Sequence, residues 1–150
     1  MKEKTVLFVD DDGIVLRSIA RDLMDEPYNI CFAKSGEDAL EILLQQEVHV
    51  LVTDIRMPGM NGVELLKIVT QKYPKIVKMV LSGYTNTSDL MTAIYKEGVL
   101  KFIPKPWNLE EGEEFRAIIK RAIDHYNHQI EQAARPEAEL NPCLHHISEK

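Results

Sequence analysis

The sequence predicts an α/β domain in which five parallel strands form one doubly wound sheet with helices on both faces. Short aliphatic and β-branched runs alternate five times with longer segments of helical period, which is the pattern of successive βα units. The first, third and fourth runs are almost wholly apolar, as expected for strands that are covered on both faces.

The five apolar runs are the predicted strands. They comprise residues 5–9, 28–33, 48–53, 77–81 and 100–103. Between the first two runs, apolar side chains recur at helical spacing with polar side chains on the other side, which indicates an amphipathic helix. The apolar positions are Val15, Leu16, Ile19, Ala20 and Leu23.

The other helices are predicted from their start signals. Ser35 is the expected N-cap of the second helix, with Glu37 and Asp38 in its first turn. The third helix is expected to follow Asn61, and the fourth to start near Thr85 or Thr87. The last helix is expected to open at Asn108 and to carry one apolar stripe, formed by Phe115, Ile118, Ile119, Ala122, Ile123, Tyr126 and Ile130.

The length of 150 residues predicts one domain with an extension. We place the domain at residues 1–130, because the helical pattern fades near Gln132. Residues 131–150 contain Pro136 and Pro142 in a polar stretch and are interpreted as a flexible C-terminal tail or a truncated linker. No segment of the size of a helix-turn-helix follows residue 132, which disfavours a DNA-binding regulator.

Composition narrows the class of protein. Hydrophobic residues make up 45% and charged residues 28%, as in a globular protein, and the net charge of −6 argues against nucleic acid as a direct partner. No run approaches the roughly 20 apolar residues of a membrane helix, and no export signal is evident. Cys31 and Cys143 suggest neither a zinc site nor a disulfide framework. We therefore expect a cytoplasmic protein that does not contact a membrane.

Polar side chains gather where the predicted strands end. Ligands of open parallel sheets bind at the carboxyl ends of the strands, so these positions are considered together. The first strand ends in three aspartates, and the later strands end in an aspartate, a serine followed by glycine, and a lysine. The residues are Asp10, Asp11, Asp12, Asp54, Ser82, Gly83 and Lys105.

This group has the chemistry of a cation and phosphate site. Two carboxylates about 4 Å apart repel by about 4 kcal/mol at an effective dielectric near 20, so the cluster must bind protons or a cation. Oxygen ligands with room for water suit Mg²⁺. Lys105 can pair with Asp54 and then with a phosphoryl group, Ser82 can donate a hydrogen bond to it, and Gly83 leaves space for its approach. For Asp12 we favour the role of a helix cap.

Four motifs resemble, in order and spacing, the receiver domain of two-component response regulators. The resemblance covers roughly residues 4 to 130 and implies a flavodoxin-like (CheY-like) three-layer sandwich. The motifs are Val9-Asp10-Asp11-Asp12, Asp54-Ile55-Arg56-Met57-Pro58-Gly59-Met60-Asn61-Gly62, Leu81-Ser82-Gly83-Tyr84 and Phe102-Ile103-Pro104-Lys105-Pro106-Trp107.

The resemblance implies a role for each matching residue. Asp54 would be the phospho-acceptor, and Asp10 and Asp11 the metal-binding acidic pair. Asp11 and Asp54 would bind Mg²⁺ directly, helped by the backbone carbonyl of Arg56.

Further roles follow from the later motifs. Ser82 and Lys105 match the family's Ser/Thr and lysine, and the peptide bond from Lys105 to Pro106 would be cis. Phe102 stands at the aromatic switch position, where tyrosine is more common, so it can act there only as an apolar ring. Arg56 and Tyr84 flank the site at variable positions, and we expect them to modulate dephosphorylation.

The implied function is that of a phosphorylation switch. Asp54 would take a phosphoryl group from a phosphohistidine of a sensor histidine kinase, and autodephosphorylation would follow. The chain would catalyse only its own modification and have no external substrate. The signal would pass to a partner or effector domain through the face formed by the fourth helix, fifth strand and fifth helix. A homodimer is the other assembly considered.

Two rival interpretations differ in class. A phosphorylation-independent pseudo-receiver would be an interaction module, and the complete set of acceptor-site residues speaks against it. A Mg²⁺-dependent phosphatase of the haloacid-dehalogenase type would need a second acid two residues after Asp54, where Arg56 stands. The Lys-Pro-Trp and Ser-Gly-Tyr variants resemble receivers that are joined to enzymes of cyclic-nucleotide turnover or to transcription activators.

Overall fold

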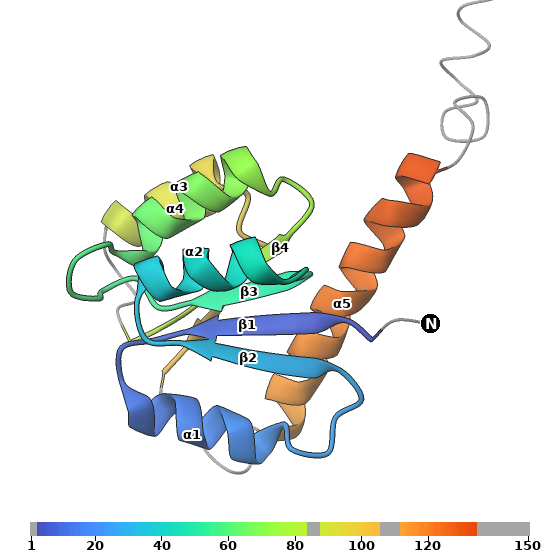
Figure 1. Cartoon of the computed structure of the whole chain (residues 1–150), viewed down its shortest axis with the longest axis horizontal. Coiled ribbons are helices and arrows are strands. Elements are labelled where there is room, and N and C mark those ends of the chain that lie inside the picture. The colour runs from blue at the N-terminus through green and yellow to red at the C-terminus, as the bar shows by residue number, and fades with distance from the viewer. Residues whose placement is uncertain (1–2, 84–87, 106–111, 135–150) are drawn as a thin grey trace, which may run out of the picture.

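A computed structural model describes residues 3–83, 88–105 and 112–134 of the chain (Figure 1). Five strands and five helices alternate along these residues. The strands are β1 (Thr5–Val9), β2 (Asn29–Ala33), β3 (Val50–Thr53), β4 (Val77–Ser82) and β5 (Lys101–Pro104). The helices are α1 (Gly13–Asp22), α2 (Gly36–Gln45), α3 (Gly62–Lys72), α4 (Ser88–Lys96) and α5 (Gly112–Ala134).

All five strands form one parallel sheet in the order β2-β1-β3-β4-β5. Helices α1 and α5 cover one face, and α2, α3 and α4 cover the other (Figure 1). The predicted doubly wound, flavodoxin-like three-layer architecture is therefore confirmed. The chain order reverses direction between β1 and β3, the kind of position at which open α/β sheets bind ligands.

Each face of the sheet has its own hydrophobic core. Successive residues of a strand point to opposite faces, so Leu7 packs beneath α2 and α3 while Phe8 packs on the side of α1 and α5. On that side, the rings of Phe8 and Phe115 lie 6.2 Å apart. Because β1, β3 and β4 are buried along their whole length, the near-continuous apolar runs are explained.

The strands differ from the predicted ranges by one or two residues at some ends. β2 begins at Asn29 and β3 at Val50, while β4 extends to Ser82 and β5 covers Lys101–Pro104. The difference arises because apolar side chains report burial, whereas a strand is defined by backbone pairing. Val48, for example, is buried but precedes the ladder of β3 with β1.

The predicted helix caps are confirmed. The Ser35 hydroxyl accepts a hydrogen bond from the Asp38 amide at 3.0 Å, which begins α2. Asn61 and Glu64 form a reciprocal capping box at the start of α3. The Asp12 carboxylate accepts from the Ile14 amide at 2.9 Å, so Asp12 caps α1 as expected.

The last two helices are described in part. Thr85, Thr87 and Asn108, at which their starts are expected, lie outside the described residues. The predicted apolar stripe of α5 is buried or half-buried against the sheet. The helix continues to Ala134, past residue 130, where the sequence places the end of the domain. Within the described residues, no helix has the length and apolar character needed to cross a bilayer.

Gly62 lies where the chain passes closest to the end of β3. Its amide donates to the carbonyl of Ile55 at 2.7 Å. A Cβ atom at this position would overlap the backbone carbonyl of Asp54 and lie 2.8 Å from the Cα atom of Ile55. Both obstacles are backbone atoms of a buried strand end and cannot move aside cheaply.

Gly62→Ala is therefore expected to lower the free energy of unfolding by about 1–3 kcal/mol, the range typical of overpacking. Urea denaturation measures this value. Gly13→Ala is the matched control, because its nearest neighbours are the flexible end of the Lys34 side chain, at 3.4 Å. Equal stabilities of the two variants would contradict the proposed close approach.

His49 is buried just before β3 and is held as a neutral ring. Its Nδ1 accepts a hydrogen bond from the Thr5 amide at 2.9 Å, and its Nε2 lies 3.5 Å from a carboxylate oxygen of Glu47. The ring meets Tyr126 of α5 edge to face, with centroids 4.9 Å apart. Burial lowers the pKa of His49, although the charge of Glu47 acts in the opposite direction.

A lowered pKa means that the fold favours the neutral imidazole, so His49 stabilises the protein above pH 6.5 and this stabilisation is lost as the pH falls below it. We expect the unfolding free energy of His49→Gln to depend less on pH than that of the wild type between pH 7.5 and 5.5. The difference cannot exceed about 1.4 kcal/mol per pH unit. His125→Gln, at an exposed position of α5, should keep the wild-type dependence.

Candidate functional site

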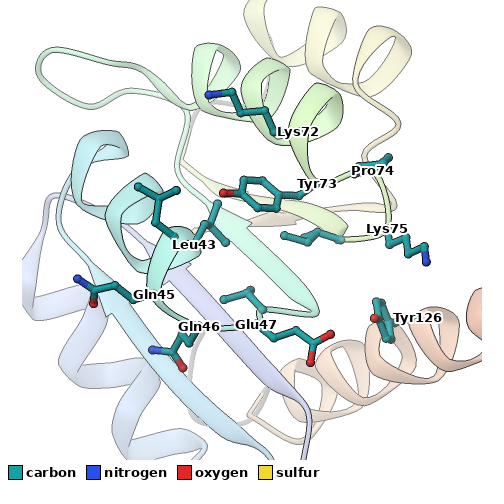
Figure 2. Close-up of a pocket in the computed structure, with 12 residues that line it drawn as sticks. Leu43, Gln45, Gln46, Glu47, Lys72, Tyr73, Pro74, Lys75 and Tyr126 are labelled. Atoms are coloured by element: carbon teal, nitrogen blue, oxygen red, sulfur yellow. The ribbon is translucent and has the colours of Figure 1, made fainter.

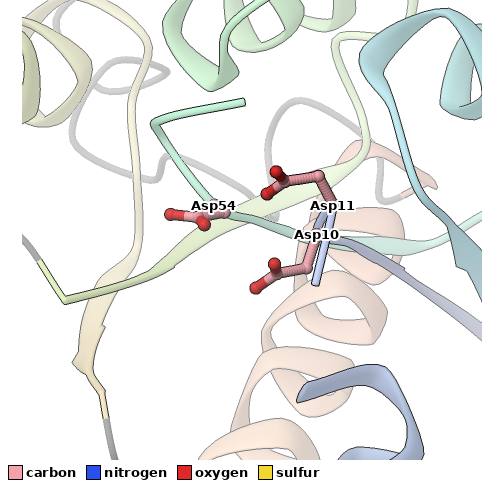
Figure 3. A group of neighbouring side chains, drawn as sticks. All are labelled: Asp10, Asp11 and Asp54. Carbon is pink, nitrogen blue, oxygen red and sulfur yellow. The ribbon is translucent and has the colours of Figure 1, made fainter. Parts of the chain in front are cut away.

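Three carboxylates meet at the carboxyl edge of the sheet. Asp10 and Asp11 follow β1, and Asp54 follows β3, its neighbour in the sheet. Since Val9 pairs with Thr53, the two strands end at the same level. One carboxylate oxygen from each aspartate lies within 4.8 Å of the others (Figure 3). The predicted convergence of these side chains is present.

Asp10 is the most buried of the three, with 2% of its surface exposed. One of its oxygens accepts from the Asp12 amide at 2.9 Å. Burial raises the pKa of Asp10, and the hydrogen bonds from Lys105 and from the Asp12 amide only partly oppose that effect. A nearby cation would therefore stabilise the ionised form of Asp10.

Asp54 is buried to 7% exposure but reaches the edge of the sheet with one oxygen toward Lys105. Its Oδ1 accepts from the Ile55 amide at 2.7 Å, which fixes the orientation of the carboxylate. Its backbone amide donates to Val9 of β1 at 2.9 Å, and its carbonyl accepts from the Thr53 hydroxyl. These hydrogen bonds fix the position of the Asp54 backbone and the orientation of its side chain.

Lys105 contacts the two aspartates that follow β1 and β3. Its ammonium lies 2.5 Å from Oδ2 of Asp10 and 3.1 Å from Oδ2 of Asp54. Its backbone amide donates to the carbonyl of Ser82 at 3.0 Å, which holds the residue beside β4. Burial alone would lower the pKa of Lys105, but the hydrogen bonds to Asp10 and Asp54 outweigh it and raise the pKa. Lys105 is accordingly a fixed positive charge at neutral pH.

Ser82, which carries the predicted hydroxyl, and Gly83, at which open space is expected, lie next to Lys105. Ser82 is the last residue of β4, is fully buried and pairs with Pro104 of β5. Among the residues that the structure describes, a Cβ atom on Gly83 would come within 4 Å only of the Cβ of Lys105, at 4.0 Å.

The remaining predicted residues are less closely tied to the group. Phe102 is half-buried on β5 and packs against the core on the side of α2 and α3. Arg56 is exposed in the connection after Asp54. Tyr84 and Pro106 lie outside the described residues.

The donor set suits a hard divalent cation. Asp10, Asp11 and Asp54 supply only oxygen atoms, and Asp11 is exposed, which leaves an open side for water or an anion. Magnesium is typically bound by one or two carboxylates with other positions left to water and phosphate. The fixed carboxylate of Asp54 next to an ammonium can also present a nucleophilic oxygen to an anionic group.

Two features of the site were not predicted from the sequence. The closest partner of Lys105 is Asp10, whereas only Asp54 was expected to pair with it. The position of Asp10 and Asp54 at the ends of adjacent strands was the signal that could have predicted the contact of Lys105 with Asp10. The second feature is Gly62, which lets the chain pass against the carbonyl of Asp54. Its place directly after the Asn61 cap was the signal that could have identified it.

Comparisons with known proteins agree with this geometry. Residues 6–115 match the response regulator receiver domain family. The hydrogenase transcriptional regulatory protein HoxA of Cupriavidus necator is 41% identical over 71% of the chain, and the DNA-binding transcriptional regulator NtrC of Escherichia coli K12 is 32% identical over 86%. The chain spans only 22% and 27% of these two relatives, about a quarter of their length.

A solved structure shows the same fold. The signal receiver domain of an HD domain-containing protein from Pseudomonas fluorescens Pf-5 is 25% identical, with a TM-score of 0.81 over 87% of this chain and 94% of that one. The fold, the carboxylate edge and the match over residues 6–115 lead to one conclusion. The chain belongs to the response regulator receiver domain family.

Proposed function

We propose that Asp54 accepts a phosphoryl group from a phosphohistidine of a sensor histidine kinase and that the domain transmits this event as a conformational switch. The observation that carries the proposal is the shared contact of the Lys105 ammonium with Asp10 and Asp54 inside the carboxylate group. A structural role alone does not require three carboxylates and a lysine at one strand edge.

In the transfer step, a carboxylate oxygen of Asp54 attacks the phosphorus atom in line with the leaving imidazole nitrogen. A P–O bond to Asp54 forms and the P–N bond of the phosphohistidine breaks, which gives an acyl phosphate and a neutral or protonated histidine on the kinase. Hydrolysis of the acyl phosphate later restores the carboxylate. The Ile55 amide holds Asp54 in one orientation, so little ordering is needed at the moment of attack.

Lys105 changes partner in this mechanism. At rest its ammonium is divided between Asp10 and Asp54, and the transferred phosphoryl oxygens give it a stronger anionic acceptor. Despite burial, the contacts with Asp10 and Asp54 raise the pKa of Lys105, so it enters the reaction as an ammonium that acts by charge and hydrogen bonding.

Asp10, Asp11 and Asp54, together with the backbone carbonyl of Arg56, are the groups proposed to hold magnesium. When bound, the ion supplies positive charge that screens the carboxylates from the incoming phosphoryl group. Asp10 contributes a buried carboxylate whose ionised form burial disfavours, so a cation at this edge relieves an existing cost.

Ser82 and Phe102 are the proposed switch residues. Ser82 donates to a phosphoryl oxygen, and the half-buried ring of Phe102 moves further into the core as the end of β4 shifts. Both residues lie on the paired strands β4 and β5. The change would therefore be transmitted through the surface of α4, β5 and α5 to an effector segment, a partner protein or a second copy.

The size and names of the relatives support an effector. Two transcriptional regulators resemble this chain over about a quarter of their own length, which is consistent with a receiver that controls a further domain.

Arg56 and Tyr84 are proposed to modulate the lifetime of the acyl phosphate, because the exposed side chain of Arg56 follows Asp54 by two residues. Location in the cytoplasm stays a prediction.

Incubation of the full chain with magnesium and acetyl phosphate tests the acceptor. The wild type should gain the mass of one phosphoryl group in a form labile to hydroxylamine, and Asp54→Asn should gain none, because an amide oxygen does not form a stable acyl phosphate. Intact-protein mass spectrometry measures the adduct.

Asp12→Asn is the matched control for this experiment, since Asn caps a helix as well as Asp does and Asp12 lies at the same edge. It should be phosphorylated like the wild type. An adduct that persists in Asp54→Asn would reassign the acceptor. No adduct on the wild type at saturating magnesium would favour the phosphorylation-independent pseudo-receiver.

Magnesium is expected to raise the Tm of the protein, and EDTA to reverse the rise, because a ligand that binds only the folded state stabilises it. Asp11→Asn should weaken the apparent magnesium affinity at least about tenfold, a loss typical even of second-shell partners. Asp12→Asn again serves as control and should behave as the wild type. Equal affinity of Asp11→Asn and wild type would exclude Asp11 as a ligand.

A further inference from the structure

A cavity of about 470 Å³ opens at the base of the domain, at the opposite end of the sheet from Asp54 (Figure 2). Val48 and Ile76, which precede β3 and β4, belong to its wall, whereas Asp54 and Ser82 mark the other ends of these strands. We call it the basal cavity. It lies between the end of α2, the connection from α3 to β4, and α5.

The basal cavity is apolar inside and basic at its rim. Leu43, Val48 and Ile76 line it with the ring of Tyr73, and Leu44 stands beside it with 77% of its surface exposed. Lys72 and Lys75 flank it, and Figure 2 shows both side chains directed outward.

The Glu47 carboxylate also belongs to the wall, but the two lysines outnumber it and leave the rim with a net positive charge. The surface therefore fits a segment that presents aliphatic side chains to the cavity and carboxylates to Lys72 and Lys75.

A segment of this kind follows α5 in the sequence. Tyr126 of α5 forms part of the wall, and α5 ends at Ala134, eight residues later and about 12 Å along the helix axis. Residues 135–150 can span roughly 50 Å when extended, so they can turn back from Ala134 to the cavity.

The sequence of residues 135–150 has the required chemistry. Four apolar residues, which we call the tail stripe, are spaced i, i+3, i+4, i+7, as on one face of a helix. Glu137 and Glu139 precede this stripe in the sequence. The tail stripe consists of Leu140, Cys143, Leu144 and Ile147.

We propose that residues 135–150 fold back and seat the tail stripe in the basal cavity, with Glu137 and Glu139 toward Lys72 and Lys75. Because the segment is tethered, its effective concentration at the cavity is in the millimolar range, so weak contacts are enough to hold it. The docked segment would cover Leu44 and the contact of Tyr126 with His49. Any chain beyond residue 150 would then leave from the base of the domain and not from the tip of α5.

Disulfide trapping in the full chain tests this proposal. In a Cys31→Ser background, Leu44→Cys should form an internal disulfide with Cys143 under mild oxidation, detected by mass spectrometry and non-reducing electrophoresis. Met24→Cys is the matched control, since Met24 is 71% exposed and lies outside the cavity. We expect the Leu44→Cys variant to form the internal bond at least about tenfold faster, because docking adds to the tether concentration.

A second substitution separates docking from chance collision of the tail. Leu144→Asp in the Leu44→Cys protein should slow the internal disulfide at least about tenfold, since it removes an apolar contact and leaves the tether unchanged. Equal rates for the two cysteine positions, or no effect of Leu144→Asp, would overturn the proposal. Disulfide-linked dimers in place of the internal bond would also overturn it and assign the basal cavity to a second copy.

Discussion

The ammonium of Lys105 lies between carboxylates that follow two neighbouring strands, and the arrangement of the whole edge depends on it. Parallel pairing brings Asp10 and Asp54 together, and like charges within 4.8 Å repel by about 3 kcal/mol at an effective dielectric near 20. Lys105 offsets this repulsion, and its backbone hydrogen bond to Ser82 of β4 helps to hold it in place. The geometry of the edge therefore depends on the order of the strands, because Lys105 connects the Asp54 carboxylate to the ends of β4 and β5.

Most of the fold could be predicted from the sequence, because the deciding signals are local. Apolar runs marked the strands to within one or two residues, since burial on both faces leaves few polar positions in β1, β3 and β4. Ser35 and Asn61 marked helix starts through their own side chains. The grouping of Asp10, Asp11 and Asp54 followed from topology, since parallel strands end at one edge. Their roles in phosphoryl transfer rest on the proposed function.

Contacts between segments that are distant in the chain could not be predicted from the sequence. The preference of Lys105 for Asp10 depends on side-chain reach across 95 residues of chain, and the passage of Gly62 over the Asp54 carbonyl depends on the path of a loop. His49 and Lys78 stand within runs predicted to be covered on both faces, but the sequence does not show what accommodates their polar side chains. Both are buried, and burial lowers the pKa of each. Tyr126, which meets the His49 ring, and Glu97, whose charge acts on Lys78, lie far along the chain, and no local period predicts such contacts.

The length of α5 has a mechanical consequence. The helix packs on the sheet along its apolar stripe, and Tyr126, whose ring meets His49, is the last of its fully packed residues. Beyond Tyr126, the remaining turns of α5 up to Ala134 extend about 12 Å, at 1.5 Å per residue. A tilt of about 10° at Tyr126 would displace the helix end by roughly 2 Å. A small repacking of α5 on the sheet would therefore produce a larger movement at Ala134.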